Sequence, residues 1–387
     1  MRIFPTGKPQ LKIIYFTAII TICSLYAAQP IQPVFQQEFE LTNLQALLFT
    51  TLMMFPLGIA PLFYGFLLET FSAKLLVRGA VLMLGVLELV FACSTSYFSL
   101  LLIRAVQGLM IPAILTSLMS YISFTSDRDN VQHSIAVYIA ATIVGGFLGR
   151  FLSGLSTELF GWRYFFVFLG LLLMVAFYLL RILEKDANME YAKPRPMEVL
   201  ALLRKGGYFW LYIGIFSIFF VFSAMMNFLP FALKQINPGA GEAGIGFLYF
   251  GYAMGIYVSL NSRRMIYIFG SEADAVRIGI VIFFIGTTLF MIENYQAMFA
   301  AMFVFCTGLF MAHSLLSGLV NKLSSHTKAI ANGVYISFYY MGGTFGSFLP
   351  GYFFEHYGWR GFLIFLQGVL VFSFFCINMM KKHVSAL

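Results

Sequence analysis

The chain reads GGFLGRFLSGLSTELFGWR at residues 145–163 and GGTFGSFLPGYFFEHYGWR at residues 342–360. The two stretches lie 197 residues apart, about half of the 387-residue chain, and 13 of the 25 ungapped positions from 145 to 169 recur in the second copy. A duplication at this distance predicts two related halves. Both copies lie in apolar runs without a preceding strand or a following Lys-Ser/Thr. Their glycines therefore indicate close helix packing and not a phosphate-binding loop.

The composition around the repeat is that of a membrane protein. Only 10% of the residues are charged and 60% are hydrophobic, with 46 Phe and a mean hydropathy of +0.86. About a quarter of a soluble domain is charged, so a cytosolic enzyme, a secreted disulfide scaffold and a disordered chain are excluded. The apolar runs are continuous, which excludes a porin-like barrel. Four isolated cysteines give no reason to expect a disulfide or a metal site.

A membrane-spanning helix needs about 20 mostly apolar residues. Twelve such segments follow one another, at residues 12–35, 45–68, 75–95, 97–123, 131–157, 161–183, 207–233, 243–261, 276–293, 296–320, 329–354 and 360–380. We therefore predict an all-α membrane protein with twelve transmembrane helices in two pseudo-symmetric six-helix lobes. The N-terminal lobe is expected at 1–183, a cytoplasmic linker at 184–206 and the C-terminal lobe at 207–387. Parallel repeats of this kind are typical of transporters whose substrate site lies between the lobes at mid-membrane.

The basic residues predict the orientation. With both termini in the cytoplasm, 19 of the 24 Lys and Arg fall in cytoplasmic segments, as the positive-inside rule requires. We expect a multi-pass protein of a bacterial-type inner membrane with both termini cytoplasmic. The basic excess reflects topology, and we expect no nucleic-acid partner because no stripe of base-reading residues is present.

Three motifs carry a resemblance to a known family. Span 1 ends in Tyr26-x-x-Gln29-Pro30-x-x-Pro33, span 4 contains Arg104-x-x-Gln107-Gly108, and span 5 holds the glycine-rich stretch that leads to Trp162-Arg163. Together they resemble the major facilitator superfamily, and within it the YnfM-like, arabinose-efflux-type branch. The resemblance implies a twelve-helix secondary transporter that works by alternating access. We expect no cofactor, and the chain has no Walker motif for direct use of ATP.

The chain departs from the family pattern at two places. The loop after span 2 keeps Gly65, Glu69 and Lys74 of the pattern G-x-x-x-D-R-x-G-R-K but loses two bases and a glycine. We expect a cytoplasmic gate of Gly65, Glu69, Lys74 and Arg128, in which Glu69 pairs with Lys74 or Arg128. Span 5 lacks the Gly-Pro step of the antiporter motif, which leaves the direction of transport open.

Two arginines lie inside predicted spans. A charge there costs at least about 2.5–3.5 kcal/mol on insertion scales, which makes each a functional candidate. The resemblance implies that Arg104 takes part in proton coupling or substrate contact, and the alternative is a structural pair with Glu88. Arg150 lies one turn from Gly146 and from Gly154, and its planar fork of donors suits a carboxylate or phosphate. Its alternative is a hydrogen bond to carbonyls of a neighbouring helix.

Glu88 and His313 are the candidates for carrying a proton. Glu88 is the one carboxylate well inside a span, and a histidine titrates near neutrality. A satisfied core histidine is the alternative for His313.

The remaining candidates are substrate contacts. Span 1 and span 7 carry polar side chains at similar places, where prolines are expected to break both helices and free backbone groups that line a cavity. The full set of expected substrate contacts is Tyr26, Gln29, Gln32, Arg104, Gln107, Arg150 and Asn227, with an aromatic wall of Tyr335, Phe338 and Tyr339. The prolines concerned are Pro30, Pro33 and Pro230. The alternatives are kinks that gate without touching substrate and aromatic side chains that only pack.

The sequence thus favours a transporter and not an enzyme, because its acids are scattered. We expect proton-coupled efflux of a small organic compound by a monomer in the lipid bilayer. Two arginines against one buried carboxylate favour an anionic or amphipathic substrate. Uptake by symport or uniport of an organic anion is the alternative within transport. A receptor or regulator built on a transporter fold is the alternative outside it, against which the short linker argues.

Overall fold

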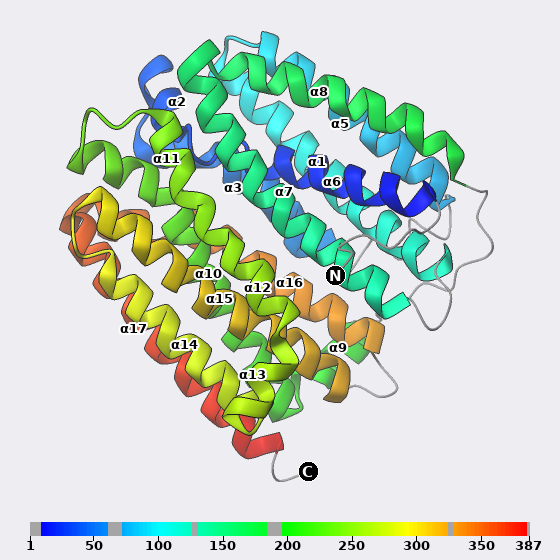
Figure 1. Cartoon of the computed structure of the whole chain (residues 1–387), viewed down its shortest axis with the longest axis vertical. Helices are drawn as coiled ribbons and strands as arrows, with labels where there is room; N and C mark the ends of the chain where they lie inside the picture. Colours follow the sequence, from blue (N-terminus) through cyan, green and yellow to red (C-terminus); the bar gives the residue numbers. More distant parts are fainter. Residues whose placement is uncertain (1–8, 61–71, 126–130, 184–195, 324–327, 385–387) are drawn as a thin grey trace.

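A computed structural model describes residues 9–60, 72–125, 131–183, 196–323 and 328–384, and in these ranges all regular structure is helical. The helices before residue 184, which we call the N-lobe, are α1 (Pro9–Tyr26), α2 (Gln32–Glu38), α3 (Asn43–Ile59), α5 (Ala73–Cys93), α6 (Tyr97–Thr125), α7 (Val131–Phe160), α8 (Trp162–Leu179) and the 3₁₀ turn η2 (Leu180–Ile182). They form the upper part of the molecule in Figure 1.

A short helix, α9 (Pro196–Leu203), precedes the second group. The C-lobe consists of α10 (Gly206–Ile236), α11 (Glu242–Leu248), the 3₁₀ segment η3 (Tyr249–Tyr252), α12 (Ala253–Leu260), α13 (Ser262–Phe269), α14 (Glu272–Leu289), α15 (Tyr295–Leu323), α16 (Lys328–Gly346) and α17 (Gly351–Val384). It forms the lower part of Figure 1.

The all-helical membrane fold predicted from the sequence is confirmed. Within the described ranges, eight helices are long and apolar enough to cross a membrane, and α3 is a shorter apolar helix. The other expected spans coincide with α11 to α12, α14 and α16, so the helices are consistent with twelve spans. Span 1 is broken as expected, because α1 ends before the prolines and α2 begins with Pro33 in its first turn.

The duplicated glycines set the packing inside each lobe. In the N-lobe α7 packs on α1, and in the C-lobe α16 packs on α10. A Cβ at Gly145 would lie 2.5 Å from the carbonyl oxygen of Ile19, and one at Gly342 would overlap that of Phe216. Ile19 and Phe216 are again 197 residues apart. The repeat therefore encodes the same close helix crossing twice, and no larger residue fits at either glycine.

The Gly-Trp-Arg ends of the repeat anchor the next helix in both lobes. Gly161 and Gly358 adopt φ values of 95° and 64°, which residues with a Cβ avoid, and the chain turns there. The two arginines then form ion pairs, Arg163 with Glu38 at 2.7 Å and Arg360 with Glu293 at 2.9 Å. Each glycine thus starts a peripheral helix, and each arginine ties its first turn to a neighbouring segment.

The lobes contact each other at one end of the bundle. There α7 packs on α11, and α3 packs on α16. The Glu158 carboxylate accepts a hydrogen bond of 2.8 Å from the backbone N–H of Ala243 in the first turn of α11. Gly154 and Gly351 of the repeat lie against Glu242 and Leu44 of the opposite lobe. The same glycine positions therefore close both halves of this interface.

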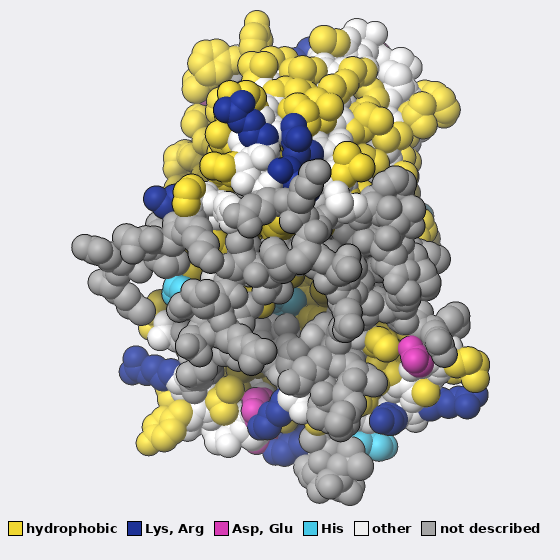
Figure 2. All heavy atoms as spheres, turned by 90° about the vertical axis from the view of Figure 1, so that its right-hand side faces the viewer, with side chains coloured by type: hydrophobic (Ala, Val, Ile, Leu, Met, Phe, Trp, Pro, Cys, Tyr) yellow, Lys and Arg dark blue, Asp and Glu magenta, His cyan; other side chains and the backbone are white. Residues whose placement is uncertain are grey.

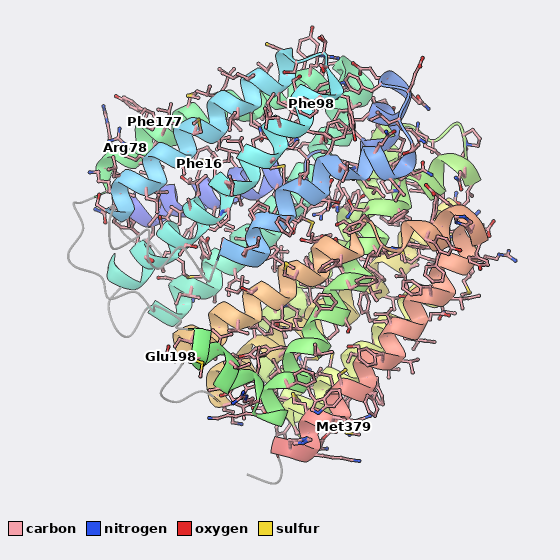
Figure 3. All side chains as sticks on the ribbon, turned by 180° about the vertical axis from the view of Figure 1, so that it is seen from behind. Phe16, Arg78, Phe98, Phe177, Glu198 and Met379 are labelled. Atoms are coloured by element: carbon pink, nitrogen blue, oxygen red, sulfur yellow. The ribbon has the colours of Figure 1, made fainter. Side chains whose placement is uncertain are left out.

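Labelled side chains in Figure 3 mark the ends of both lobes. In Figure 3, Arg78 near the start of α5 and Phe98 near the start of α6 mark opposite ends of the N-lobe, and Met379 near the end of α17 lies toward the lower edge of the C-lobe. Figure 2 shows the face turned toward the right of Figure 1, where the described basic side chains outnumber the acidic ones.

We predict that Gly145→Ala and Gly342→Ala lower the melting temperature of the purified protein. The added methyl groups push α7 from α1 and α16 from α10, at a cost of about 1–3 kcal/mol each. Gly79→Ala is the control, because nothing lies within 4 Å of a Cβ at this exposed helix position. An equal loss in the control would show that helix packing is not what the repeated glycines protect.

Candidate functional site

Arg150 is a buried charge at the boundary between the lobes. Its side chain projects from α7 and is fully buried. Nε donates to the Gln29 Oε1 at 2.6 Å, and Nη1 donates to the Gly146 carbonyl oxygen at 2.7 Å. Neither hydrogen bond uses Nη2. The glycine one turn before the arginine leaves room for the guanidinium to fold back along its own helix.

Three tyrosine rings surround this guanidinium. Its carbon lies 3.9 Å from the ring centre of Tyr26, 4.8 Å from that of Tyr252 and 5.4 Å from that of Tyr249. Tyr26 ends α1 in the N-lobe, whereas the other two belong to η3 in the C-lobe. Cation–π contacts are worth about 0.5–2 kcal/mol each. The positive charge is therefore enclosed by both lobes and helps to hold them together.

A second, uncharged cluster also bridges the lobes. Gln32 Nε2 donates to Thr50 Oγ1 at 2.9 Å and to Asn227 Oδ1 at 3.0 Å. Asn227 Nδ2 lies 3.1 Å from Ser347 Oγ, to which it donates. Ser347 is the repeat equivalent of Arg150, whereas Asn227 lies one position beyond Met226, the repeat equivalent of Gln29. Gln32 Oε1 is buried without a hydrogen-bond partner.

The expected break of span 7 at Pro230 is wrong. Helix α10 continues through this residue to Ile236. Proline lacks the N–H that would bond to the carbonyl oxygen four residues earlier, that of Met226. The Tyr249 hydroxyl donates to this oxygen at 3.2 Å. The carbonyl freed by Pro230 is thus satisfied from η3, and the helix has no need to unwind.

His313 and the aromatic wall lie in the C-lobe. The Tyr335 hydroxyl donates to the His313 carbonyl oxygen at 3.1 Å and lies 2.9 Å from His313 Nδ1. A hydroxyl has one proton, so the second contact makes Nδ1 the donor and leaves Nε2 as an acceptor. The ring centre of Tyr339 lies 4.5 Å from that of the imidazole, with the two planes tilted by 34°. Phe338 instead stacks on Tyr212 at 5.5 Å.

Arg104 lies inside the N-lobe and not between the lobes. Its Nη1 is 4.0 Å from Glu88 Oε1, and both side chains are fully buried. The guanidinium stacks on Phe91 and Phe166 at 3.9 and 4.7 Å. The pair with Glu88 is therefore the arrangement that the structure shows. Substrate contact by Arg104 is not supported, because aromatic rings of its own lobe cover it.

The Glu88 pair belongs to a network with unpaired atoms. Ser24 of α1 donates to Glu88 Oε1, and Gln107 lies beside the carboxyl. Among the described residues, no hydrogen-bond partner is found for Glu88 Oε2, Arg104 Nε and Nη2 or either polar atom of Gln107. Unpaired buried polar atoms cost free energy. The network therefore keeps hydrogen-bonding capacity that its present contacts do not use.

Of the expected cytoplasmic gate, Gly65, Glu69 and Arg128 lie outside the described residues. Lys74, at the start of α5, donates hydrogen bonds to the carbonyl oxygens of Arg181 and Leu183. These carbonyls follow α8, so the lysine caps a helix C-terminus and ties α5 to α8.

Several functional candidates escaped the sequence analysis. Tyr249 and Tyr252 lie in an apolar span without a charge to mark them, and Ser347 replaces the arginine of the first repeat copy. Glu158 recurs in the repeat as Glu355, and this was the only signal available for it. Its contact with α11 depends on how the lobes meet.

Comparison with known proteins decides the family. The model of the Major Facilitator Superfamily matches residues 14–271. The chain belongs to this superfamily. The resemblance seen in the sequence is confirmed, and the chain is a multi-pass membrane transporter of small molecules and not an enzyme.

Similar proteins cover most of the chain. The inner membrane transport protein YnfM of Escherichia coli is 26% identical over 95% of this chain and 90% of its own length. An uncharacterized transporter of Buchnera aphidicola is 25% identical over 92% and 88%. A bacterial homolog of the lysosomal transporter Spinster, in an inward-facing and unoccupied conformation, matches with a TM-score of 0.78, 13% identity and coverage of 97% and 99%. The nucleoside transporter NupG matches with a TM-score of 0.78 and 14% identity, over 96% of this chain and 98% of its own.

We predict that Tyr252→Leu opens the lobe contact of this superfamily member and that Tyr252→Phe does not. Phenylalanine keeps an aromatic face for Arg150, whereas leucine removes about 0.5–2 kcal/mol and raises the open population by up to about thirtyfold. The distance between labels on Phe160→Cys and Gln235→Cys, two exposed positions on opposite lobes, reports the opening.

The exposed Cys93 is first replaced by serine so that it takes no label. Equal effects of leucine and phenylalanine, or no effect of either, would show that the ring does not hold the lobes together.

Proposed function

We propose that the chain exports a small anionic or amphipathic organic compound in exchange for protons, by rocking the N-lobe against the C-lobe. The observation that carries the proposal is the Arg150 guanidinium, which is buried at the lobe boundary between rings of both lobes. Burying a cation at this position costs free energy, because the guanidinium must lose its water each time the lobes close. Such a cost favours a functional role for Arg150.

An anionic group fits the chemistry around Arg150. The guanidinium presents a planar fork that binds carboxylates and phosphates in bidentate geometry. The tyrosine faces that now cover it belong partly to η3, so separation of the lobes uncovers one side of the fork. A bound carboxylate would then replace the aromatic contacts, while Gln29 keeps the side chain oriented. Flat tyrosine faces beside the cation suit the apolar body of an amphipathic compound.

Glu88 is the proposed proton carrier. Its carboxylate pairs with Arg104 when ionised, and protonation removes the counter-charge. Ser24 lies on α1 and donates a hydrogen bond to Glu88. Gln29 lies in the turn after α1 and accepts one from Arg150. A change of charge at Glu88 therefore acts on the segment that positions Arg150. This shared segment is the proposed physical link between proton binding and substrate binding.

The contact between the lobes assigns the conformation within this proposal. The lobes meet through α7 with α11 and α3 with α16, at the end of the helices where α2 and α11 begin. With both termini in the cytoplasm, this end faces outward. The conformation is then inward-facing, ready to take up an exported compound from the cytoplasm.

The test uses the purified protein in liposomes that contain a pH-sensitive dye. Organic acids, sugars and cationic drugs are added in turn under an imposed pH gradient. Antiport of an organic acid predicts proton movement opposite to that of the compound. Proton movement in the same direction would overturn export in favour of uptake, and movement of compound alone would overturn proton coupling.

We predict that Glu88→Gln reduces the pH-gradient-driven rate by at least about tenfold, equivalent to about 1.4 kcal/mol. The amide keeps the shape of the side chain and can still accept the hydrogen bond from Ser24, but it cannot gain or lose a proton in this pH range. Exchange of labelled for unlabelled compound without a gradient should persist, which separates a coupling defect from misfolding. Glu355→Gln, at an exposed acid of the C-lobe, is the matched control and should keep the wild-type rate. Unchanged pH dependence in Glu88→Gln would remove this residue as the carrier.

A further inference from the structure

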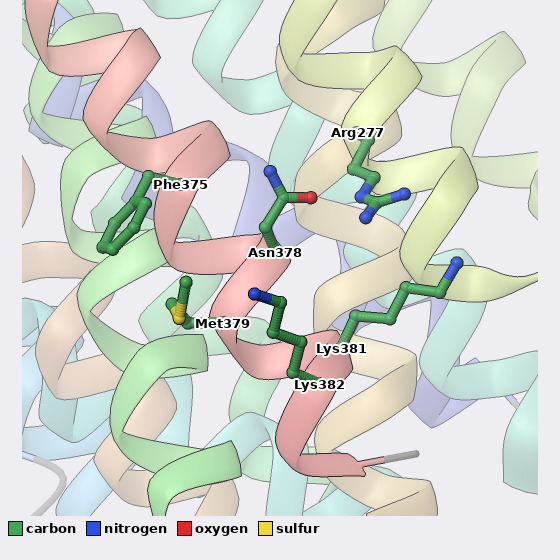
Figure 4. Close-up of a pocket in the computed structure, with 6 residues that line it drawn as sticks. All are labelled: Arg277, Phe375, Asn378, Met379, Lys381 and Lys382. Carbon is green, nitrogen blue, oxygen red and sulfur yellow. The ribbon is translucent and has the colours of Figure 1, made fainter.

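A pocket lies on the outside of the C-lobe, away from the lobe boundary. It has a volume of about 660 Å³ and is lined by Arg277 of α14 and by Phe375, Asn378, Met379, Lys381 and Lys382 of α17. Figure 4 shows these side chains on the surface of α17, with Arg277 reaching toward them from α14. None of them takes part in the contacts of Arg150 or Glu88.

The pocket lies where the apolar surface of the lobe ends. Along α14 and α17 large apolar side chains are exposed, a surface that is stable only against lipid chains. They include Ile278, Val281 and Ile285 on α14 and Ile364, Val371, Phe372 and Phe375 on α17. Beyond Phe375, within two turns, the helix surface becomes basic. The pocket therefore lies at the level where acyl chains give way to phospholipid headgroups.

Positive charge is in excess at this pocket. Asp274 accepts from Arg277 Nη1 at 2.7 Å and from Lys381 Nζ at 2.8 Å. One carboxylate thus faces two cations, and in the described part of the chain no carboxylate forms an ion pair with Lys382. Arg277 Nε is buried without a hydrogen-bond partner. Among the described residues at this pocket, three cations therefore stand against one carboxylate, and Arg277 Nε is an unused donor.

We propose that this pocket binds the phosphate of an anionic phospholipid of the phosphatidylglycerol type. Lysine and arginine donors bind phosphate oxygens through charge-assisted hydrogen bonds, and the Asn378 amide adds a neutral donor. Phe375 and Met379 contact the start of the acyl chains. Free phosphate would accept the same hydrogen bonds but has no acyl chain to contact Phe375 and Met379. A zwitterionic lipid would place its own positive group in a pocket that is already positive. An anionic lipid is therefore the best match.

The bound lipid stabilises the C-lobe by joining two peripheral helices. Arg277 and the lysines come from α14 and α17, which otherwise meet at this end through Asp274. A phosphate shared between them adds a second bridge. A ligand that binds only the folded state stabilises it by RT ln(1 + L/Kd), where L is the lipid concentration, so the melting temperature rises with L.

The test measures lipid binding by the full chain. The protein is delipidated in detergent, and the bound lipid is counted by native mass spectrometry while the melting temperature is followed. Phosphatidylglycerol, phosphatidylcholine and inorganic phosphate are titrated separately. We expect saturable binding and a raised melting temperature with phosphatidylglycerol only.

Two variants locate the binding site. Lys382→Gln removes a cation that does not pair with Asp274, so the fold should persist, and we expect about fivefold weaker binding of phosphatidylglycerol. Arg181→Gln removes one positive charge from the exposed basic end of the N-lobe and should leave binding unchanged. Equal losses in the two variants would mean diffuse attraction and overturn the site.

The source of the phosphate is tested separately. Phe375→Ala should weaken binding of the lipid, because its acyl contact is lost. Saturation by inorganic phosphate at millimolar concentration, with no further gain from the lipid, would assign the pocket to a soluble phosphate compound. Equal binding of phosphatidylcholine would show that net charge does not select the lipid. Either result would overturn the proposal.

Discussion

The close crossing of α7 over α1, repeated by α16 over α10, is the constraint on which the rest of the structure depends. At Gly145 the backbone of α7 touches that of α1, and at Gly342 the backbone of α16 touches that of α10. These close crossings hold the following turns of α7 and α16 against polar residues in or just after their partner helices. Arg150 thereby meets Gln29, and Ser347 meets Asn227. Larger residues at the glycines would separate these pairs. Helix packing and the polar contacts at the lobe boundary thus have one common cause.

The charges of the two buried arginines are stabilised by different kinds of partner. Arg104 has a carboxylate counter-ion and is sealed by Phe91 and Phe166 within one lobe. Arg150 has no carboxylate among its hydrogen-bond partners and relies on an amide, a carbonyl and tyrosine faces from both lobes. A charge held by neutral partners is free to bind an anion when the lobes separate. A charge with its own acid responds to protons instead. In the cycle that we propose, Arg150 binds the substrate and Glu88 with Arg104 responds to protons, and α1 with the turn after it connects the two sites.

The lobes close against each other mainly through weak and uncharged contacts. Gln32 and Asn227 exchange one hydrogen bond, and Glu158 bonds to a backbone N–H of α11. Contacts of this kind are each worth about 0.5–3 kcal/mol, the upper end applying to charged partners. Contacts of this strength fit the separation of the lobes that the proposed alternating access requires. The lipid pocket lies away from it, on helices that form the outer surface of the C-lobe, and would stabilise that lobe without holding the interface shut.

The sequence by itself determined the all-helical membrane fold, because apolar runs of spanning length leave the backbone no other way to satisfy its hydrogen bonds in lipid. It also determined the duplication, the packing glycines and the superfamily. It identified Arg150, Glu88 and Arg104 as candidates because charge inside a span is rare, and Gln29 because it is a polar residue beside the prolines that break span 1. Only the tertiary structure decided that Arg104 faces Glu88 while Arg150 meets tyrosines of the other lobe, and that α10 passes Pro230 unbroken with help from Tyr249. Periodicity and composition report what each helix contains, whereas these outcomes depend on which helix lies beside it.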